Sequence, residues 1–262
     1  MCLITFAYRA HPRYSLILAA NRDEFFQRPS TPLQYWEDYP DILAGRDQEQ
    51  GGTWLGLNKL GQFATVTNFR NGRDRRTDLR SRGHLTARYL QDSTTAQAYL
   101  QALQPTQQSY GAFNLLLGDQ DGLHYLSNRS DAEATRLKPG VYGLSNALLD
   151  TPWPKLQHVK EGLRDLIAQP QLAPENLLSL MQDTTPVADT QLPDTGISLE
   201  WERLLSTCFI RSASYGTRAI SLLLQQPDGT TEFWEHSFTE HEAGETRRYT
   251  LQLPPIGGTA AS

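Results

Sequence analysis

The N-terminal stretch MCLITFAYRAHPRYSLILAANRDEF, residues 1–25, decides the fold that we expect for this chain. Residues 3–8 and 15–20 are rich in apolar and β-branched side chains, and the connection between them contains Pro12. Two such runs joined by a short turn are typical of a β-hairpin. The apolar runs are short and interrupted by charges, unlike a signal peptide or a spanning helix. We therefore expect the chain to enter a sheet from its second residue.

Strand and helix signals alternate in blocks along the rest of the chain. Apolar and β-rich runs predict further strands at 53–57, 62–69, 112–118, 123–127, 219–225, 232–238 and 248–252. Helical spacing predicts two helices between residues 81 and 105, one over 154–167 and one over 174–181. Hairpins with helices gathered in separate blocks favour an α+β layered protein over alternating βαβ units. We expect two antiparallel sheets sandwiched by helices.

The length of 262 residues is compatible with one domain that has one large core. We assign residues 1–254 to this domain and residues 255–262, which are Pro255 and the terminal IGGTAAS, to a flexible tail. The segment 184–198 is rich in Thr, Pro and Asp and is expected to be a surface loop.

Composition and charge exclude several classes of protein. The chain is 39% hydrophobic and 20% charged, which argues against disorder and against a transmembrane segment. Its net charge of −5 gives no general attraction to nucleic acid. The two cysteines, Cys2 and Cys208, form neither a disulfide scaffold nor a zinc-binding spacing, so we expect no metal site. A reducing, cytoplasmic location fits this cysteine usage.

Cys2 is the residue on which we expect any chemistry to depend. Removal of an initiator methionine is favoured before a small residue, and it would leave a thiol and a free α-amine together on Cys2. The ordinary pKa of an α-amine is about 7.7–8.0 and that of a thiol about 8.5, close enough for proton transfer between them. A cysteine in a strand is also often a small buried hydrophobe, and its position alone leaves that alternative open.

The tetrad Asn21-Arg22-Asp23-Glu24 follows the second strand, at the end of the hairpin that should lie beside Cys2. The guanidinium of Arg22 would favour the thiolate. The carboxylate of Asp23 would accept a hydrogen bond from the α-ammonium and orient it. A salt-bridged strand end is the structural alternative for these residues.

Three further polar residues are candidates for the same site. Asn68 and Asn146 each end an apolar, strand-like run, where a side-chain amide can donate to a developing oxyanion. Each can equally be an ordinary turn asparagine. Arg218 precedes an apolar strand and offers a second guanidinium or a surface charge.

Taken together, six segments resemble the NRDE family, whose animal members are called transport and Golgi organisation protein two. They are NRDE at 21–24, GGTWLGLNKLGQFATVTNFR at 51–70, SRGHL at 81–85, YGAFNLLLGD at 110–119, YGLSNALLDTPWPK at 142–155 and YGTR at 215–218. The chain is more distantly similar to N-terminal-nucleophile (Ntn) amidohydrolases of the choloylglycine hydrolase and penicillin V acylase type. This resemblance implies a four-layer αββα sandwich and a cysteine amidohydrolase that acts on linear C–N amide bonds of small molecules without a required cofactor.

The resemblance also implies roles for individual residues. Cys2 matches the N-terminal cysteine of these hydrolases, and Asn68 matches their oxyanion asparagine. Asn146 matches a second asparagine of their catalytic site, and Arg218 resembles their late arginine.

The pattern departs from those hydrolases at the tetrad. When Phe25 is aligned with their aromatic residue, Asn21 falls at their arginine and Glu24 at their aspartate. Arg22 and Asp23 would then have to act in place of that pair, which leaves Asn21 and Glu24 as candidates for substrate binding.

A non-enzymatic carrier on the same fold is the alternative, because members of the NRDE family have been linked with haem trafficking and with acyl-CoA or lipid handling. A cleft between two sheets can hold an apolar ligand without turning it over. Haem is then a candidate ligand, with His84 and His124 as its neighbours and Cys2 as a ligand to iron. The candidate contacts for acyl-CoA or another substrate are Trp54, Phe69 and Arg70.

Overall fold

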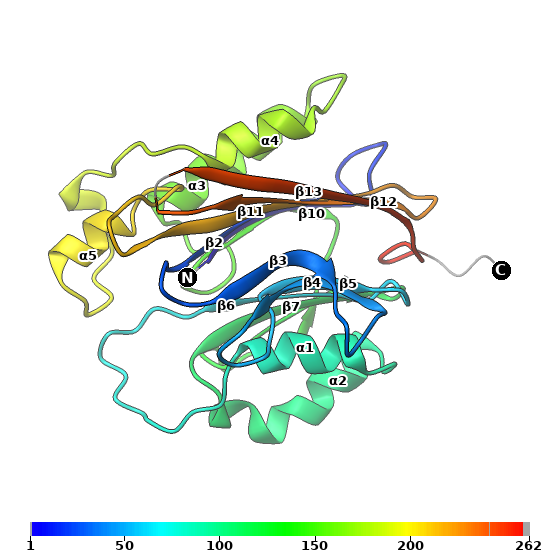
Figure 1. Cartoon of the computed structure of the whole chain (residues 1–262), viewed down its shortest axis with the longest axis horizontal. Helices are drawn as coiled ribbons and strands as arrows, with labels where there is room; N and C mark the ends of the chain where they lie inside the picture. The colour runs from blue at the N-terminus through cyan, green and yellow to red at the C-terminus, as the bar shows by residue number, and fades with distance from the viewer. Residues whose placement is uncertain (1, 241, 259–262) are drawn as a thin grey trace.

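A computed structural model of the chain describes residues 2–240 and 242–258. Two antiparallel sheets pack face to face, and helices cover the outer face of each sheet (Figure 1). The order of layers is therefore α, β, β, α, which confirms the four-layer sandwich expected for this chain.

The first sheet has six strands in the order β10-β1-β2-β11-β12-β13. They are β1 (Cys2–Tyr8), β2 (Leu16–Phe25), β10 (Gly140–Leu144), β11 (Tyr215–Gln225), β12 (Thr230–Phe238) and β13 (Ala243–Gln252). The predicted N-terminal hairpin is confirmed, and its register pairs Cys2 with Arg22 and Ile4 with Ala20.

The second sheet has seven strands, β3 to β9, in chain order. They are β3 (Ser30–Tyr35), β4 (Ile42–Asp47), β5 (Leu55–Asn58), β6 (Phe63–Asn68), β7 (Phe113–Asp119), β8 (Gly122–Ser127) and β9 (Thr135–Arg136). The sequence did not predict β3 and β4, because prolines and polar residues interrupt the apolar pattern between residues 26 and 52.

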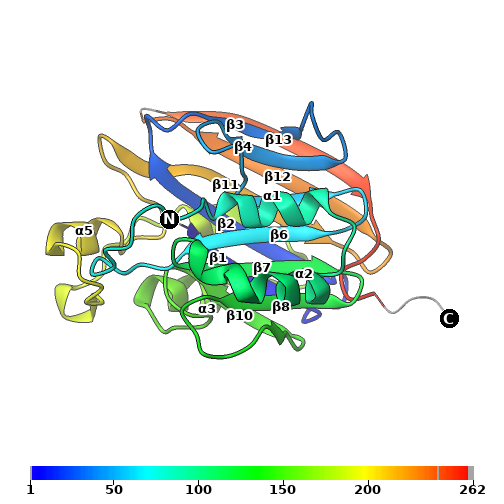
Figure 2. The ribbon, with the colours of Figure 1, turned by 90° about the horizontal axis from the view of Figure 1, so that it is seen from below.

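Two helices, α1 (Gly83–Gln91) and α2 (Ala96–Leu103), lie against the outer face of the second sheet, and Figure 2 shows them in front of β6, β7 and β8. Helices α3 (Pro154–Ile167) and α4 (Pro174–Met181) cover the first sheet. All four were expected, whereas the short α5 (Leu199–Leu204) was not. The described residues also contain two 3₁₀ helices, Gln104–Ser109 and Asp189–Gln191. No helix in the described part of the chain is long and apolar enough to cross a membrane.

Alternation along β1 separates two parts of the core. Ile4 and Phe6 pack between the two sheets, whereas Leu3 and Ala7 pack toward α3 and α4. Successive side chains of a strand point to opposite faces, so Cys2 shares the face of Ile4. The strand therefore directs the Cys2 side chain into the space between the sheets.

The C-terminal segment differs from the expected tail. Ile256 is buried in the core between the sheets, and its backbone N–H donates to Gln225. Gly257 donates to the carbonyl of Asp119. Residues 255–258 are therefore part of the packed domain, and residues 259–262 lie outside the described residues.

Candidate active site

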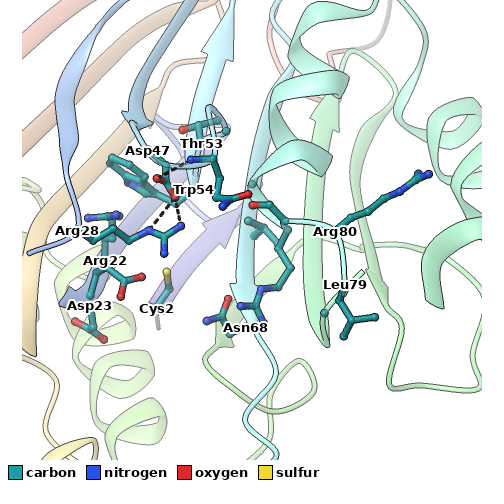
Figure 3. A pocket seen from close by; sticks show the side chains of 18 residues that line it. Cys2, Arg22, Asp23, Arg28, Asp47, Thr53, Trp54, Asn68, Leu79 and Arg80 are labelled. Atoms are coloured by element: carbon teal, nitrogen blue, oxygen red, sulfur yellow. Dashed lines mark hydrogen bonds and ion pairs between the residues drawn. The ribbon is translucent and has the colours of Figure 1, made fainter. Parts of the chain in front are cut away.

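A cavity of about 420 Å³ opens beside Cys2, at one end of the interface between the sheets (Figure 3). Its wall is formed by β1, β2 and β6 together with the segments that precede β5 and α1. The candidate residues that line it are Cys2, Arg22, Asp23, Glu24, Trp54 and Asn68.

Cys2 is half-buried on this wall, with Asp23 on one side and Asn68 on the other (Figure 3). Its carbonyl oxygen accepts a hydrogen bond from the Ser145 hydroxyl at 3.4 Å. Burial raises the pKa of the Cys2 thiol, and Asp23 adds to this rise whereas Arg22 opposes it. A thiol whose pKa is raised in this way needs a base before it can act as a nucleophile.

The tetrad is divided between the two faces of β2. Arg22 is directly opposite Cys2 in the hairpin, and its guanidinium stacks on the Trp54 ring at 4.1 Å. Asn21 points the other way, and its Nδ2 donates to the carbonyls of Met181 at 2.9 Å and Cys208 at 2.8 Å. Asn21 is thus not on the cavity wall, contrary to the contact with substrate that we expected.

The two acidic residues of the tetrad are both held by hydrogen bonds. The Oδ1 atom of Asp23 accepts from the Thr217 hydroxyl at 2.7 Å, and Oε1 of Glu24 accepts from the backbone N–H of Phe25 at 2.9 Å. Burial raises the pKa of Asp23, and the nearby Lys155 ammonium opposes that rise.

Lys155 is a buried residue that the sequence reasoning did not single out. Its Nζ donates to the carbonyl of Leu205 at 2.7 Å, and burial lowers its pKa to about 8. The only signal for it was its place in the TPWPK segment, at the start of a predicted helix. A lysine in an amphipathic helix is ordinarily solvent-exposed, so pattern alone would not have found it.

The two candidate asparagines have different places. Asn68 lies at the end of β6 on the cavity wall. Asn146 is fully buried behind it, and its Nδ2 donates to the Asn68 carbonyl at 2.9 Å. The Asn146 carbonyl in turn accepts from the backbone N–H of Arg70 at 2.7 Å. Asn68 therefore lies on the same cavity wall as Cys2, and the hydrogen bonds of Asn146 fix the backbone at Asn68 and Arg70.

Arg218 lies outside the cavity wall. One of its guanidinium nitrogens donates to the carbonyls of Phe25, Phe26 and Arg28, at 2.9, 3.2 and 3.1 Å. The same guanidinium lies over the Phe26 ring at 5.6 Å. Arg218 thus holds the turn between β2 and β3, close to the tetrad but not in contact with the cavity.

Arg70 is also directed away from the cavity. It forms an ion pair with Glu202 at 2.7 Å, and its guanidinium lies over the Trp153 ring at 4.8 Å. Phe69 is half-buried next to it and is not among the residues of the cavity wall. Of the three expected contacts for acyl-CoA, only Trp54 lines the cavity.

Neither of the two candidate haem neighbours is among the residues of the cavity wall. His84 is near the start of α1, where its Nε2 contacts the carbonyl of Gln50. His124 is buried on β8, in a different hollow that it shares with residues of α2. The described residues contain no group of three or more His, Cys, Asp or Glu side chains placed to hold a metal ion.

Comparison with known sequences agrees with the resemblance noted above. The family model "Transport and Golgi organisation 2" matches residues 1–240. The Transport and Golgi organization 2 homolog of Mus musculus is 34% identical over 97% of this chain and 99% of its own length. The Homo sapiens homolog has the same identity and coverage, and the Drosophila melanogaster protein is 27% identical over 91% of this chain and 93% of its own length.

Solved structures with a similar chain path come from hydrolases. A Caenorhabditis elegans N-acylethanolamine-hydrolyzing acid amidase ortholog overlaps with a TM-score of 0.49 at 10% identity, over 70% of this chain and 86% of that one. A mutant of the conjugated bile acid hydrolase from Clostridium perfringens overlaps with a TM-score of 0.42 at 10% identity, over 96% of this chain and 97% of that one. The four-layer fold is established by its own sheets and helices rather than by these overlaps.

Proposed function

The chain belongs to the Transport and Golgi organisation 2 family, and we propose that this member is a Cys2-dependent amidohydrolase that cleaves linear C–N amide bonds. The observation that carries the proposal is the placement of Cys2. It is the second residue of the chain, its side chain lines a cavity, Arg22 lies directly opposite it in the hairpin, and Asn68 lies on the same wall.

The reaction begins with processing, because removal of Met1 leaves the α-amine on Cys2. This amine takes the proton of the thiol, and the thiolate sulfur attacks the carbonyl carbon of the amide. When the tetrahedral intermediate collapses, the C–N bond breaks and the leaving amine takes the proton from the α-ammonium. Water then attacks the thioester, releasing the acid and regenerating the thiol.

The neighbouring residues have distinct roles in this scheme. The Asn68 amide donates to the oxyanion, and Asn146 acts as a positioning residue through its hydrogen bond to the Asn68 carbonyl. The Arg22 guanidinium, fixed by stacking on Trp54, stabilises the thiolate. The Asp23 carboxylate, held by Thr217, accepts from the α-ammonium and orients it.

Replacement of Cys2 by alanine tests the proposal directly. With a panel of N-acyl amides, the purified wild type should lack Met1 by intact mass and should show an acyl-enzyme mass shift and turnover. Cys2→Ala should lose both signals, because the attacking sulfur is gone. The matched control Cys208→Ala removes a buried thiol outside the cavity and should keep them. Turnover by Cys2→Ala, or turnover by a chain that retains Met1, would refute the mechanism.

A carrier for haem or acyl-CoA on the same cavity is the second candidate. It is supported by the cavity itself, because a hollow of about 420 Å³ with Cys2 half-buried on its wall can hold a ligand without turning it over. Haem addition would then give a Soret band that weakens in Cys2→Ala, and native mass spectrometry would detect acyl-CoA that co-purifies. Absence of both ligands together with turnover of an amide would exclude the carrier. The cytoplasmic location remains a prediction.

A further inference from the structure

Most of the charged side chains around the cavity already have a partner. Arg28 forms ion pairs with Asp47 at 2.7 Å and with Glu49 at 3.1 Å, and Figure 3 shows the contact with Asp47. The guanidinium of Arg80 points away from Cys2 in the same view. Asp23 and Glu24 each accept a hydrogen bond, as described above.

Two guanidiniums on the wall keep unused donors. Within the described ranges, neither Arg22 nor Arg82 forms an ion pair, although both line the cavity with Cys2. Arg22 is 6% exposed and stacks on Trp54, and Arg82 makes one side-chain hydrogen bond, to the Ala112 carbonyl at 3.3 Å. Each guanidinium has five N–H donors, so most of them have no hydrogen-bond partner in the described part of the chain.

Arg82 is held in a fixed position by the backbone at Gly111. A Cβ atom at residue 111 would lie 3.2 Å from one terminal nitrogen of Arg82 and 3.4 Å from its Cζ. The guanidinium therefore packs against the bare backbone of Gly111 while it donates to the next residue. A guanidinium fixed in this way loses little side-chain entropy when it binds a ligand.

The net charge favours an anion at this place. The charged side chains of the wall leave one net positive charge, because four arginines, Arg22, Arg28, Arg80 and Arg82, lie there with three carboxylates, Asp23, Glu24 and Asp47. Burial of a guanidinium strengthens its attraction for an anionic oxygen, because water competes less for the donors. Burial lowers the pKa of both arginines, and the charge of Glu24 opposes this fall, which places Glu24 within electrostatic reach of both guanidiniums.

We propose that Arg82, with Arg22, binds an anionic oxygen group of the ligand, a carboxylate or a phosphate, beside the Cys2 sulfur. Combined with the function proposed above, this assigns the enzyme to acidic amides, in which the anionic group lies within a few bonds of the scissile carbonyl. The anion site itself does not depend on hydrolysis, and it can be tested through the chemistry of the Cys2 thiol alone.

Alkylation of Cys2 by two small reagents measures the anion site. Iodoacetate and iodoacetamide both react by the same step, in which the thiolate sulfur forms a bond to carbon and iodide leaves. They differ in charge, so the ratio of their rates, compared with that of free cysteine at about pH 8.5, reports attraction of an anion. Peptide mapping separates Cys2 from Cys208, whose thiol pKa is raised by burial to about 12.

The proposal predicts a relative preference of wild-type Cys2 for iodoacetate of about tenfold, which is the effect of one charge-assisted hydrogen bond. Arg82→Gln should abolish this preference. Arg82→Lys should keep part of it, because lysine has the positive charge but not the planar guanidinium that can form two parallel hydrogen bonds. The matched control Arg13→Gln removes an exposed charge near the opposite end of the β1–β2 hairpin and should keep the preference.

Competition identifies the anionic group. Slower alkylation of Cys2 in butyrate but not in phosphate assigns a carboxylate, and the reverse assigns a phosphate. A wild-type rate ratio equal to that of free cysteine, or an Arg82→Gln variant with the wild-type ratio, would overturn the proposal. A preference for iodoacetate in a protein that turns over no amide would keep the anion site and refute the hydrolase.

Discussion

Replacing Glu202 by glutamine tests how strongly the fold depends on its buried ion pair with Arg70. The two charged groups are 2.7 Å apart, and each side chain is 5% exposed. The second carboxylate oxygen accepts hydrogen bonds from the backbone N–H of Thr195, at 2.9 Å, and from its hydroxyl, at 2.5 Å. The pair therefore joins the chain just after β6 to α5 and to the loop 184–198.

Removal of one partner leaves a buried charge without its counter-ion, which costs about 3–5 kcal/mol. Glutamine has nearly the same size as glutamate and can still accept the hydrogen bonds from Thr195. We therefore expect the free energy of unfolding to fall by about 3 kcal/mol, at the lower end of this range. For a chain of this length each kcal/mol lowers Tm by about 2–4 °C. Glu202→Gln should therefore lower Tm by about 6–12 °C.

Urea denaturation followed by tryptophan fluorescence and by circular dichroism gives the free energy of unfolding. Asp189→Asn is the matched control, because it removes an ion pair with Arg203 in the same region whose two side chains are each 52% exposed. Asp189→Asn should leave the urea concentration at the midpoint of unfolding unchanged within error. Replacing both Arg70 and Glu202 by methionine should restore most of the free energy of unfolding that Glu202→Gln loses, because no unpaired charge is then buried. A loss below about 1 kcal/mol in Glu202→Gln would refute the reasoning, because the pair would then be no stronger than an exposed one.

Two further predictions concern the cavity wall and the core between the sheets. Gly52→Ala should cost about 3 kcal/mol or more in urea denaturation, because a Cβ would lie 2.4 Å from the carbonyl carbon of Gly83. Gly51→Ala, at a φ of 71° with nothing within 4 Å, should cost about 1–2 kcal/mol, and equal losses would contradict this account. Burial raises the pKa of Glu235 to about 7, so the stability it contributes is present below its unfolded pKa of about 4.3 and is lost as pH rises through about 7. Glu235→Gln should flatten the pH dependence of Tm in that window, and a variant with the wild-type slope would speak against it.

The sequence predicted most of the fold where periodicity is strong. The hairpin of β1 and β2 and the helix α3 follow directly from apolar spacing and from the proline that opens the helix. Strands β3 and β4 were missed because prolines and charges mask their alternation. Helix α5 has only six residues, too few to show a period. The packing of Ile256 depends on contacts with residues distant in sequence, which a local pattern does not contain.

The sequence could predict which candidate residues are neighbours where one hairpin brings them together. The pairing of Cys2 with Arg22 follows from the length of the turn, so the sequence could place them together. Arg70 was a candidate contact for acyl-CoA, and Arg218 was a candidate second guanidinium. The directions of both side chains depend on which buried carboxylate or carbonyl lies nearby. Arg82 was missed because the charge of a loop residue says nothing about the cavity it faces.

The tetrad shows why the chemistry and the packing of this protein are coupled. Because side chains alternate along β2, Arg22 faces the cavity while Asn21 holds the carbonyls of Met181 and Cys208 in the opposite layer. A shift of β2 by one residue would exchange these faces, removing the guanidinium from Cys2 and leaving both carbonyls without their donor. The hydrogen bonds of Asn21 therefore fix the register that presents Arg22 to the thiol. It follows that a polar residue remote from the cavity can be as necessary to the site as one that lines it.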